Sequence, residues 1–423
     1  MCDTIAGELL VSFHENDAAA DALIESIQLG KVSHVDIIDE LGQRVTKSGL
    51  PMRRGIHFRF YLLRVPAGEE AYKVNYLQFH YKQEILRALG NKRMDLVKNK
   101  EILEQSNYHF QVIPHSWLTV RQANAPTGIG FSFTQTHDDY KQLIGWSSSA
   151  GTTETKKVLV LDTGLDPASS YNVVSKVNFV DDSKLSDVSD DHGHGTAVTE
   201  VIHDLCNSAE FVIYKVADSN GRASEWDTLA ALAAQSEADL VNISLAFGLA
   251  DRICSRCGRE SQSSRSAVFE NMINQLDAAD DGPLLVAAAG NDSLNELSYP
   301  ARYNNIVAIE SVNQSRQLSQ FSNHATVDHE GNNHNNVFVL PGGEKSQNAS
   351  PTEYIGTSIS GKKFYGTSFA TAYASGLIAA LWSQTAHSCK DRQQLLDHLR
   401  RNADSSFSGF SHQAHGNGMM TFN

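Results

Sequence analysis

Short apolar runs alternate with helix-compatible stretches from about residue 156 onward. Five runs have the length and the branched side chains of buried strands, and they occupy residues 158–161, 211–216, 240–245, 284–289 and 306–312. Three intervening stretches are compatible with helices, at residues 195–206, 224–237 and 267–279. This alternation predicts an α/β fold with a doubly wound parallel sheet. Catalytic groups in such sheets lie in loops at the carboxyl ends of the strands.

The first 120 residues follow a different pattern, in which strand-like and helix-like segments are mixed. Strand character is found at residues 8–13, 35–38, 56–65 and 108–120, and helical spacing at residues 17–28 and 75–103. The mixture predicts a smaller α+β domain over residues 1–125. Pro126, Gly128 and Gly130 lie among small polar residues, so we expect a linker at 126–138 and the doubly wound domain at 139–423.

Composition and charge limit the classes of partner. The chain has 423 residues, enough for two or three domains, and its formal net charge is −14. Nucleic acid and anionic membranes are not expected as partners, because both need a basic face. The apolar runs are far shorter than the roughly 20 residues of a membrane span. No basic segment followed by an apolar one opens the chain, so we expect no secretory signal and a cytoplasmic location.

Three short signatures carry candidate chemistry. Asp162 follows a predicted strand in VLVLDTGLD, His194 precedes a predicted helix in DDHGHGTAV, and Ser368 begins a small-residue helix in YGTSFATAYASG. Taken singly, such an Asp is usually a turn residue, such a His is usually structural, and such a Ser is usually an N-cap. Together they supply the acid, the imidazole and the hydroxyl of a nucleophilic triad.

The order of these signatures resembles that of the subtilisin-like serine proteases, the subtilases. The resemblance covers about residues 139–382. Three further segments fall in the family's order, namely LVNISL at the substrate edge, AAAGND at the oxyanion site and LSYPARYNNIVAI at the first specificity pocket. The resemblance implies a subtilisin-like fold, with helices flanking the parallel sheet, and a serine endopeptidase that hydrolyses polypeptides.

The resemblance also assigns catalytic roles. Ser368 would be the nucleophile, and His194 would take its proton and later pass it to the leaving amine. Asp162 would hold the imidazole in the correct tautomer. The Asn291 amide and the Ser368 backbone N–H would stabilise the tetrahedral oxyanion.

A second set of residues is expected to bind the substrate. The resemblance implies that an extended peptide adds to the edge formed by Leu245, Ala246, Phe247 and Gly248, with Gly221 to Ser224 on its other side. Ala288, Ala289 and Gly290 would line the first pocket, with Ser298 near its base. None of these side chains is charged, which favours an uncharged or apolar side chain before the scissile bond.

The largest departure from the family pattern is an insertion at about residues 251–266. It contains four arginines and the pair Cys254 and Cys257. A polar surface loop is the simplest interpretation, and a lid, an autocleavage site or half of a zinc site are the alternatives. The five cysteines of the chain are scattered and do not form a disulfide framework.

No cofactor or metal is required by these motifs. The acidic run at residues 181–191, DDSKLSDVSDD, lacks a recognisable calcium-ligand spacing. We therefore interpret it as a solvated acidic loop, with calcium as the alternative.

The N-terminal region has two interpretations. It is either a propeptide, removed between residues 112 and 139, or a permanent regulatory domain that docks a protein partner. In both cases the protease would be held latent. Two other functions remain open, namely an effector protease switched on within a larger assembly, and a pseudoprotease that binds peptides without cleaving them.

Overall fold

The structure is a computed structural model, and it describes a large part of the chain. The described residues are 4–88, 110–120, 131–147, 154–234, 236–247, 265–279, 281–327, 333–346, 350–358, 361–385, 389 and 391–422. The chain forms two compact units. Unit 1 comprises Met1–Trp117, Ser224–Gln235 and Ala250–Asp280, and unit 2 comprises Leu118–Ala223, Ser236–Leu249 and Asp281–Asn423.

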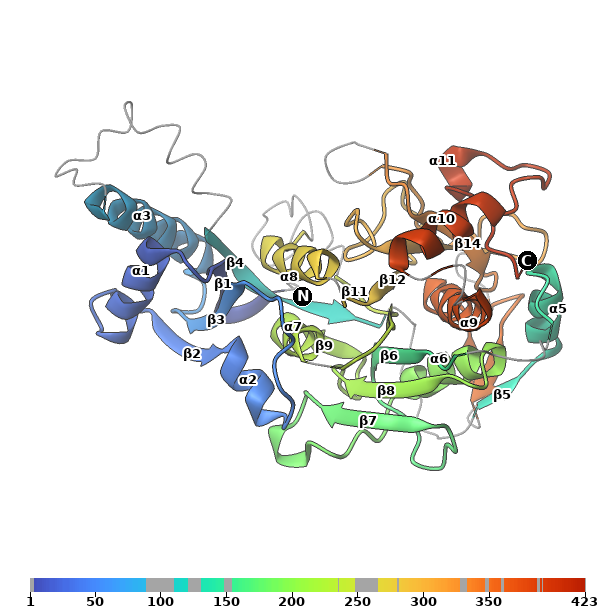
Figure 1. Cartoon of the computed structure of the whole chain (residues 1–423), viewed down its shortest axis with the longest axis horizontal. Helices are drawn as coiled ribbons and strands as arrows, with labels where there is room; N and C mark the ends of the chain where they lie inside the picture. The colour runs from blue at the N-terminus through green and yellow to red at the C-terminus, as the bar shows by residue number, and fades with distance from the viewer. Residues whose placement is uncertain are drawn as a thin grey trace. The chain divides into compact units, whose positions relative to one another are not determined.

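A parallel sheet forms the centre of unit 2 (Figure 1). Among the described residues its order is β14-β13-β12-β10-β6-β8-β7, and every neighbouring pair is parallel. The strands are β6 (Lys157–Asp162), β7 (Val173–Asn178), β8 (Glu210–Lys215), β10 (Leu240–Ile243), β12 (Leu284–Ala288), β13 (Val307–Val312) and β14 (Val337–Pro341). The predicted fold class and its five strands are confirmed. The edge strands β7 and β14 were not predicted; β7 is partly exposed along most of its length, so it lacks a continuous apolar run.

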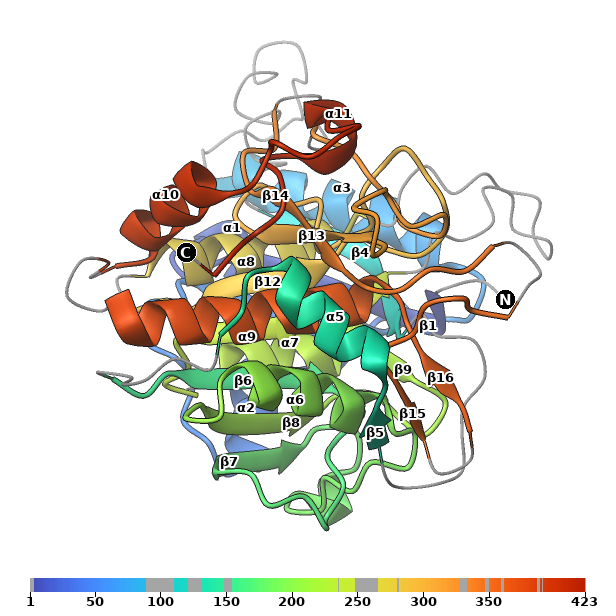
Figure 2. The ribbon, with the colours of Figure 1, turned by 90° about the vertical axis from the view of Figure 1, so that its right-hand side faces the viewer.

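Two helices cover one face of this sheet, as Figure 2 shows. α6 (His194–Leu205) packs on β6, and α9 (Thr367–Thr385) packs on β10, β12, β13, β14 and on α6 itself. The close approach of the two helices depends on Gly376, because a Cβ there would lie 2.8 Å from Leu205 Cβ. Both helices begin at the carboxyl ends of the strands, where catalytic groups are expected.

Shorter elements complete unit 2. They are β5 (Phe131–Phe133), α5 (Gln135–Leu143), the 3-10 helix η1 (Asp182–Lys184), β11 (Ala246–Phe247), β15 (Gly356–Ser358), β16 (Lys363–Phe364), α10 (Arg392–Asn402) and α11 (His412–His415). β9 (Arg222–Ser224) ends where the chain enters unit 1.

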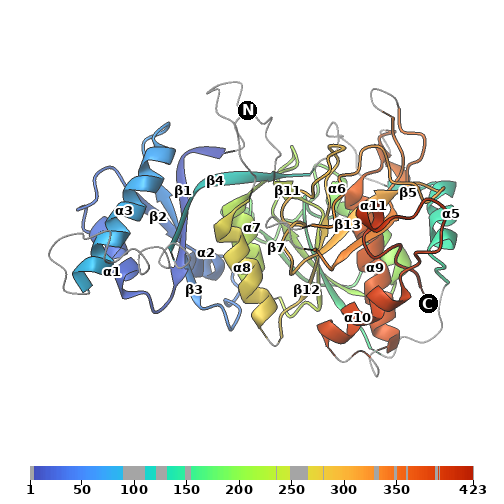
Figure 3. The same ribbon diagram turned by 90° about the horizontal axis from the view of Figure 1, so that it is seen from above.

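Unit 1 contains an antiparallel sheet with helices on both faces (Figure 3). Its elements are β1 (Thr4–His14), α1 (Ala18–Gln28), β2 (Asp36–Glu40), α2 (Leu41–Lys47), β3 (Phe58–Arg64), α3 (Glu70–Ala88), most of β4 (Phe110–Thr119), α7 (Glu225–Ala233) and α8 (Ala267–Ala278). Leu9, Val11 and Phe13 of β1 pack with α1 and α3 in one apolar core. The α+β character predicted for the N-terminal region is therefore present in the structure.

The opposite face of the N-terminal sheet packs against α7 and α8. Leu10, Ser12 and Phe60 are buried there, and Asn271 Nδ2 of α8 donates to Ser12 Oγ at 2.9 Å. The predicted boundaries assign α7 and α8 to the catalytic domain, whereas the contacts group them with the N-terminal elements. The domain boundaries themselves stay a prediction. None of the described helices is long and apolar enough to span a bilayer.

Candidate active site

Two glycine-containing turns bring Asp162 and His194 together. Asp162 ends β6, and His194 begins α6 directly after Gly193, which caps the helix with a φ of 83°. Gly195 lies so close to the turn that follows Asp162 that a Cβ on Gly195 would stand 2.3 Å from the carbonyl oxygen of Gly164. Any side chain at this position would push α6 away from β6, so the glycine is what allows the imidazole to reach the carboxylate.

The imidazole of His194 is bound to the carboxylate of Asp162. His194 Nδ1 lies 2.8 Å from Asp162 Oδ1 and 3.0 Å from Oδ2, and both residues are buried. The backbone N–H of Thr163 donates to Asp162 Oδ1 at 2.7 Å, which fixes the carboxylate. His194 Nε2 is buried and has no hydrogen-bond partner among the described residues. The arrangement leaves this nitrogen available to exchange a proton.

Ser368 lies in the first turn of α9. Its Oγ donates to the backbone oxygen of Ser244 at 3.2 Å, and Ser244 Oγ donates to the backbone oxygen of Ser368 at 3.1 Å. The ring of the next residue, Phe369, lies 5.5 Å from the ring of His194, measured between centroids. The residue after Ser368 therefore lies beside the imidazole, while among the described residues no hydrogen bond joins Ser368 to His194 Nε2. Such contacts are often long before substrate binds.

Asn291 faces the start of the same helix. Its Oδ1 accepts hydrogen bonds from the backbone N and from Oγ1 of Thr367, both at 2.9 Å. Its Nδ2 lies 3.2 Å from the point where a Cβ on Gly366 would stand, so the amide is directed at the turn that carries Ser368. The sequence predicted Asn291 but not Thr367, the residue that orients it.

Asp190 supports the turn between Asp162 and His194. It is 5% exposed, and its carboxylate accepts hydrogen bonds from Thr163 Oγ1 at 2.7 Å and from Thr196 N and Oγ1 at 2.8 and 2.7 Å. Burial acts to raise its pKa, but the hydrogen bonds from Thr196, Thr163 and Gly193 hold the pKa below the ordinary value. This acid is therefore structural, and it departs from the solvated loop predicted for residues 181–191.

The rest of that acidic run binds its own neighbours. The carboxylates of Asp181 and Asp187 accept from the backbone and the hydroxyls of Ser183 and Ser189 respectively. Within the described residues no three His, Cys, Asp or Glu side chains are grouped as metal ligands.

His192 lies beside the imidazole of His194, with 6.2 Å between the ring centroids, and Lys362 is close enough to His192 to repel its charged form. Desolvation of the buried His192 ring, together with repulsion from His194 and Lys362, lowers its pKa to about 4. Desolvation also lowers the pKa of Lys362 to about 8. His192 Nε2 stands 3.2 Å from where a Cβ on Gly221 would be, so the ring forms part of the wall near the predicted substrate strand.

The end of β4 occupies the predicted substrate edge. Thr119 pairs with Ala246 and Leu118 with Phe247 in an antiparallel register, and all four residues belong to unit 2. On the other side, the backbone N–H of Val120 donates to the carbonyl of Gly221 at 2.8 Å. A strand held from both sides is the arrangement expected for an extended peptide. The sequence located the edge but not the segment that fills it.

The predicted first pocket adjoins Thr367, the residue before Ser368. The backbone N–H of Gly290 donates to Thr367 Oγ1 at 3.3 Å, and that of Ser298 donates to the carbonyl of Ala289 at 2.8 Å. A Cβ on Gly290 would lie 2.4 Å from both Ser298 Oγ and Asn323 Nδ2, and these two atoms are 3.1 Å apart. Asn323, which the sequence did not indicate, thus contacts Ser298 and would form the polar floor of the predicted pocket together with it.

The other predicted binding residues have varied positions. Leu245 is buried, and Ala288 ends β12 in the parallel sheet. Ser224 is the N-cap of α7: its Oγ accepts from Asp227 N at 3.0 Å and donates to Asp227 Oδ2 at 2.7 Å. Gly248, Cys254 and Cys257 lie outside the described residues.

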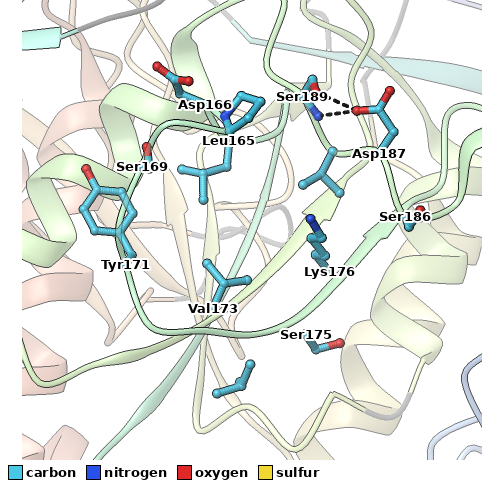
Figure 4. A pocket seen from close by; sticks show the side chains of 13 residues that line it. Leu165, Asp166, Ser169, Tyr171, Val173, Ser175, Lys176, Ser186, Asp187 and Ser189 are labelled. Carbon is cyan, nitrogen blue, oxygen red and sulfur yellow. Dashed lines mark hydrogen bonds between the residues drawn. The ribbon is translucent and has the colours of Figure 1, made fainter.

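A separate cavity of about 530 Å³ lies between the β6–β7 connection and residues 186–189 (Figure 4). Tyr171, Lys176 and Asp187 contribute to its lining, and Asp187 accepts two hydrogen bonds from Ser189. None of the residues predicted to act in catalysis or substrate binding lines this cavity. It is therefore distinct from the candidate active site.

Comparison with known proteins identifies the family. The model of the subtilase family matches residues 153–418, more than half of the chain. The chain therefore belongs to the subtilase family of serine proteases, as the order of its motifs predicted.

Three curated relatives illustrate the extent of the similarity. The chain is 28% identical over 249 residues to the major intracellular serine protease of Bacillus subtilis (strain 168), which covers 54% of this chain and 68% of that protein. It is 31% identical over 267 residues to subtilisin BL of Lederbergia lenta, with 59% and 83% covered. Its match to the thermophilic serine proteinase of Bacillus sp. (strain AK1) is 28% over 287 residues and spans 61% of that protein.

Solved structures share the fold. The epidermin leader peptide processing serine protease of Staphylococcus aureus superposes with a TM-score of 0.61 at 17% identity, covering 99% of this chain and 97% of that one. A lanthipeptide protease gives a TM-score of 0.52 at 20% identity, covering 68% and 94%.

Proposed function

We propose that the protein is a serine endopeptidase with Ser368 as nucleophile, His194 as general base and Asp162 as the group that orients His194. The observation that carries this proposal is the pair of short contacts from His194 Nδ1 to the Asp162 carboxylate, at 2.8 and 3.0 Å. Because Nδ1 is engaged, the proton-accepting nitrogen is Nε2, which has no other partner in the described structure.

The reaction divides into two halves. In the first, Ser368 Oγ attacks the carbonyl carbon of the scissile bond while its proton passes to His194 Nε2, and the same proton then goes to the departing amine. The acyl group remains on Ser368 as an ester. In the second half, water gives a proton to His194 and attacks the ester, and the new acid leaves as Ser368 regains its proton. Asn291 and the N–H at the start of α9 stabilise the oxyanion in each half.

We also propose that the N-terminal region keeps the enzyme latent. Leu118, Thr119 and Val120 bond to the substrate edge at Ala246, Phe247 and Gly221, where a substrate would otherwise bind. This occupation supports both a propeptide and a permanent regulatory domain, because either would exclude substrate by competition.

The first experiment compares the intact mass of the wild type and of Ser368→Ala after incubation at neutral pH. Self-maturation predicts that the wild type loses a fragment ending between residues 112 and 139 while the variant stays whole. Labelling of both proteins with a fluorophosphonate probe is measured in parallel, because the probe reports an activated serine whether or not the chain is cut.

The outcomes separate the alternatives. A labelled chain that stays whole indicates a permanent regulatory domain. Cleavage that also occurs in Ser368→Ala shows a contaminating protease and contradicts self-maturation. A wild type that is neither cut nor labelled, even after limited proteolysis has removed the N-terminal region, contradicts the protease proposal and leaves the pseudoprotease.

A further inference from the structure

The register of the strand in the cleft determines which residue of a bound peptide meets the nucleophile. Thr119 lies opposite Ala246 in an antiparallel pair. Each step forward along the peptide is one step back along the edge, so in an extended peptide that continued this register the position two residues after Thr119 would face Ser244. The backbone oxygen of Ser244 accepts the hydrogen bond from Ser368 Oγ. A peptide in this register brings the carbonyl carbon at that position next to Ser368.

In the sequence, that position belongs to Arg121, which lies outside the described residues. The segment preceding it reads Leu-Thr-Val, and Gln122 follows it. Self-cleavage in this register would therefore occur after an arginine. This differs from the uncharged side chain that the residues of the first pocket suggested in the sequence.

A buried acid is bound to the segment that carries Asn323. Glu310 of β13 has no exposed surface, and its Oε1 accepts a hydrogen bond from the backbone N of Ala325 at 2.9 Å. Its Oε2 has no hydrogen-bond partner within the part of the chain that the structure describes. A buried carboxyl oxygen without a partner is costly, and a native protein usually has a reason to keep it.

Two hydrogen bonds connect Glu310 or its neighbour to segments that carry residues of the predicted pocket. The residue before it, Ile309, accepts a hydrogen bond from the N–H of Ala289 at 3.0 Å through its carbonyl. Ala325, which binds the Glu310 carboxyl, follows Asn323 by two residues, and Asn323 would form the polar floor with Ser298. The carboxyl group therefore binds the same segment that carries Asn323, which contacts Ser298 and Gly290 of the predicted first pocket.

We propose that the first pocket takes a basic side chain, arginine or lysine, and that Glu310 is the acid that pairs with it. The inference rests on the proposed protease function and names its specificity. Two independent observations support it: the register, which selects an arginine in the chain's own sequence, and the Oε2 atom of Glu310, which has no partner among the described residues and belongs to a carboxyl bound to the segment that carries Asn323.

The pairing is physically reasonable for a buried acid. Desolvation raises the pKa of Glu310 well above its ordinary value, which favours the protonated carboxyl while the pocket is empty. A guanidinium or ammonium group nearby favours the carboxylate, and the proton then leaves to solvent. An arginine side chain gains more binding free energy from this pairing than lysine does, because its planar donors match the geometry of a carboxylate.

The test measures kcat/KM of the self-matured full-chain product on acetyl-Leu-Thr-Val-Xaa fluorogenic amides, where Xaa is arginine, lysine, citrulline or leucine. Citrulline has the shape of arginine without its charge. We expect arginine to exceed citrulline by about 100-fold in the wild type and by less than about 10-fold in Glu310→Gln. The matched control is Glu225→Gln, which alters another buried glutamate outside the cleft and should leave the ratio unchanged.

Fluorophosphonate labelling of every sample distinguishes failure of the proposed specificity from failure of the proposed protease function. A labelled enzyme that prefers leucine to arginine, or a Glu310→Gln variant with an unchanged ratio, overturns the specificity and leaves the protease function intact. Absence of labelling and of all cleavage overturns the protease function, and the specificity with it.

A second measurement avoids dependence on the folding of Glu310→Gln. Self-processing of the full chain is followed by intact mass in Arg121→Lys and Arg121→Leu. We expect a fragment that ends at residue 121 in the wild type and in Arg121→Lys, and at least about 10-fold slower processing in Arg121→Leu. Equal rates in the two variants, or a wild-type fragment with a different end, would contradict the proposal.

Discussion

The candidate triad depends on a few positions where only a small residue fits. Gly195 allows α6 to approach β6, and that approach lets the buried His194 ring reach Asp162. Around them, Asp190 and Thr163 hold the connecting turn through hydrogen bonds shorter than 3 Å. The catalytic groups are therefore oriented by packing and by buried polar contacts before any substrate arrives.

At this scale, Asn291→Ala tests the oxyanion site. The amide is oriented by Thr367, so its loss removes a donor without disturbing the bond between Asp162 and His194. We expect kcat on a peptide substrate to fall by about 10²–10³-fold, the range measured for the corresponding change in subtilisin, with KM little changed. If kcat falls equally in Asn291→Ala and Thr367→Val, the orientation of the amide by Thr367 matters as much as the amide itself. A loss below 3-fold would argue against the role of Asn291.

The sequence revealed the residues with reactive groups but not the residues that position them. Asp162, His194 and Ser368 each stand in a recognisable local signature. In the sequence, Thr367 and Asp190 look like ordinary polar residues. They act through hydrogen bonds to partners that include residues distant in the sequence. Their hydrogen bonds form only after α6, α9 and the strands have packed, so no local sequence pattern predicts them.

Among the elements, α7 contacts both the N-terminal region and α8 within unit 1. Arg44 of α2 forms a 2.9 Å ion pair with Asp227, and His115 Nε2 accepts from the backbone N of Trp226 at 3.1 Å. The first turn of α7 thus receives partners from α2 and β4. The sequence predicted α7 and α8 as helices, but their surroundings depend on contacts between segments more than 100 residues apart.

A pH-dependent stability is expected from Glu225, the first residue of α7. It is fully buried, and desolvation raises its pKa to about 8, although hydrogen bonds from Ser266 and from the backbone of Ser116 act in the opposite direction. Between pH 4.5 and 8 the native state holds a proton that the unfolded state has lost. The free energy of unfolding therefore falls as pH rises through this window, by at most about 1.4 kcal/mol per pH unit.

Urea unfolding of the full chain at pH 5, 6.5 and 8, with Ser368→Ala as background to prevent self-cleavage, measures this effect. Glu225→Gln should lose most of the decline and become the more stable protein at pH 8. Parallel pH profiles for the two chains would be the contrary result, and would show that Glu225 is ionised in the native state.

For the whole molecule, β4 is the element on which the proposed latency depends. Its first residues belong to the sheet of unit 1, and its last residues bond to the substrate edge of unit 2. One strand therefore completes the sheet of unit 1 and, in the proposed latent state, would compete with substrate. The latency of the protease stays a prediction, which the sequence supports through its N-terminal α+β region. The residues that pair with the edge were not predicted, because antiparallel pairing cannot be read from either strand alone.

Val120→Pro tests this competition. Proline removes the N–H that donates to the Gly221 carbonyl, while Val120→Ala keeps it. One hydrogen bond contributes about 1 kcal/mol, so we expect the uncut chain of Val120→Pro to react with a fluorophosphonate about 5-fold faster than the wild type. Val120→Ala should resemble the wild type. If both variants react at the wild-type rate, the segment does not control access to Ser368.

The composition of unit 1 has a consequence for the order of events during synthesis. The strands of its sheet, which end at residue 119, emerge from the ribosome before residues 225–233 and 267–278, which become α7 and α8. A sheet with Leu10 and Phe60 on its open face is then available as a template when those helices appear. A chain without residues 1–117 has to assemble α7 and α8 without this sheet. We therefore expect the loss of residues 1–117 to slow the folding of the chain.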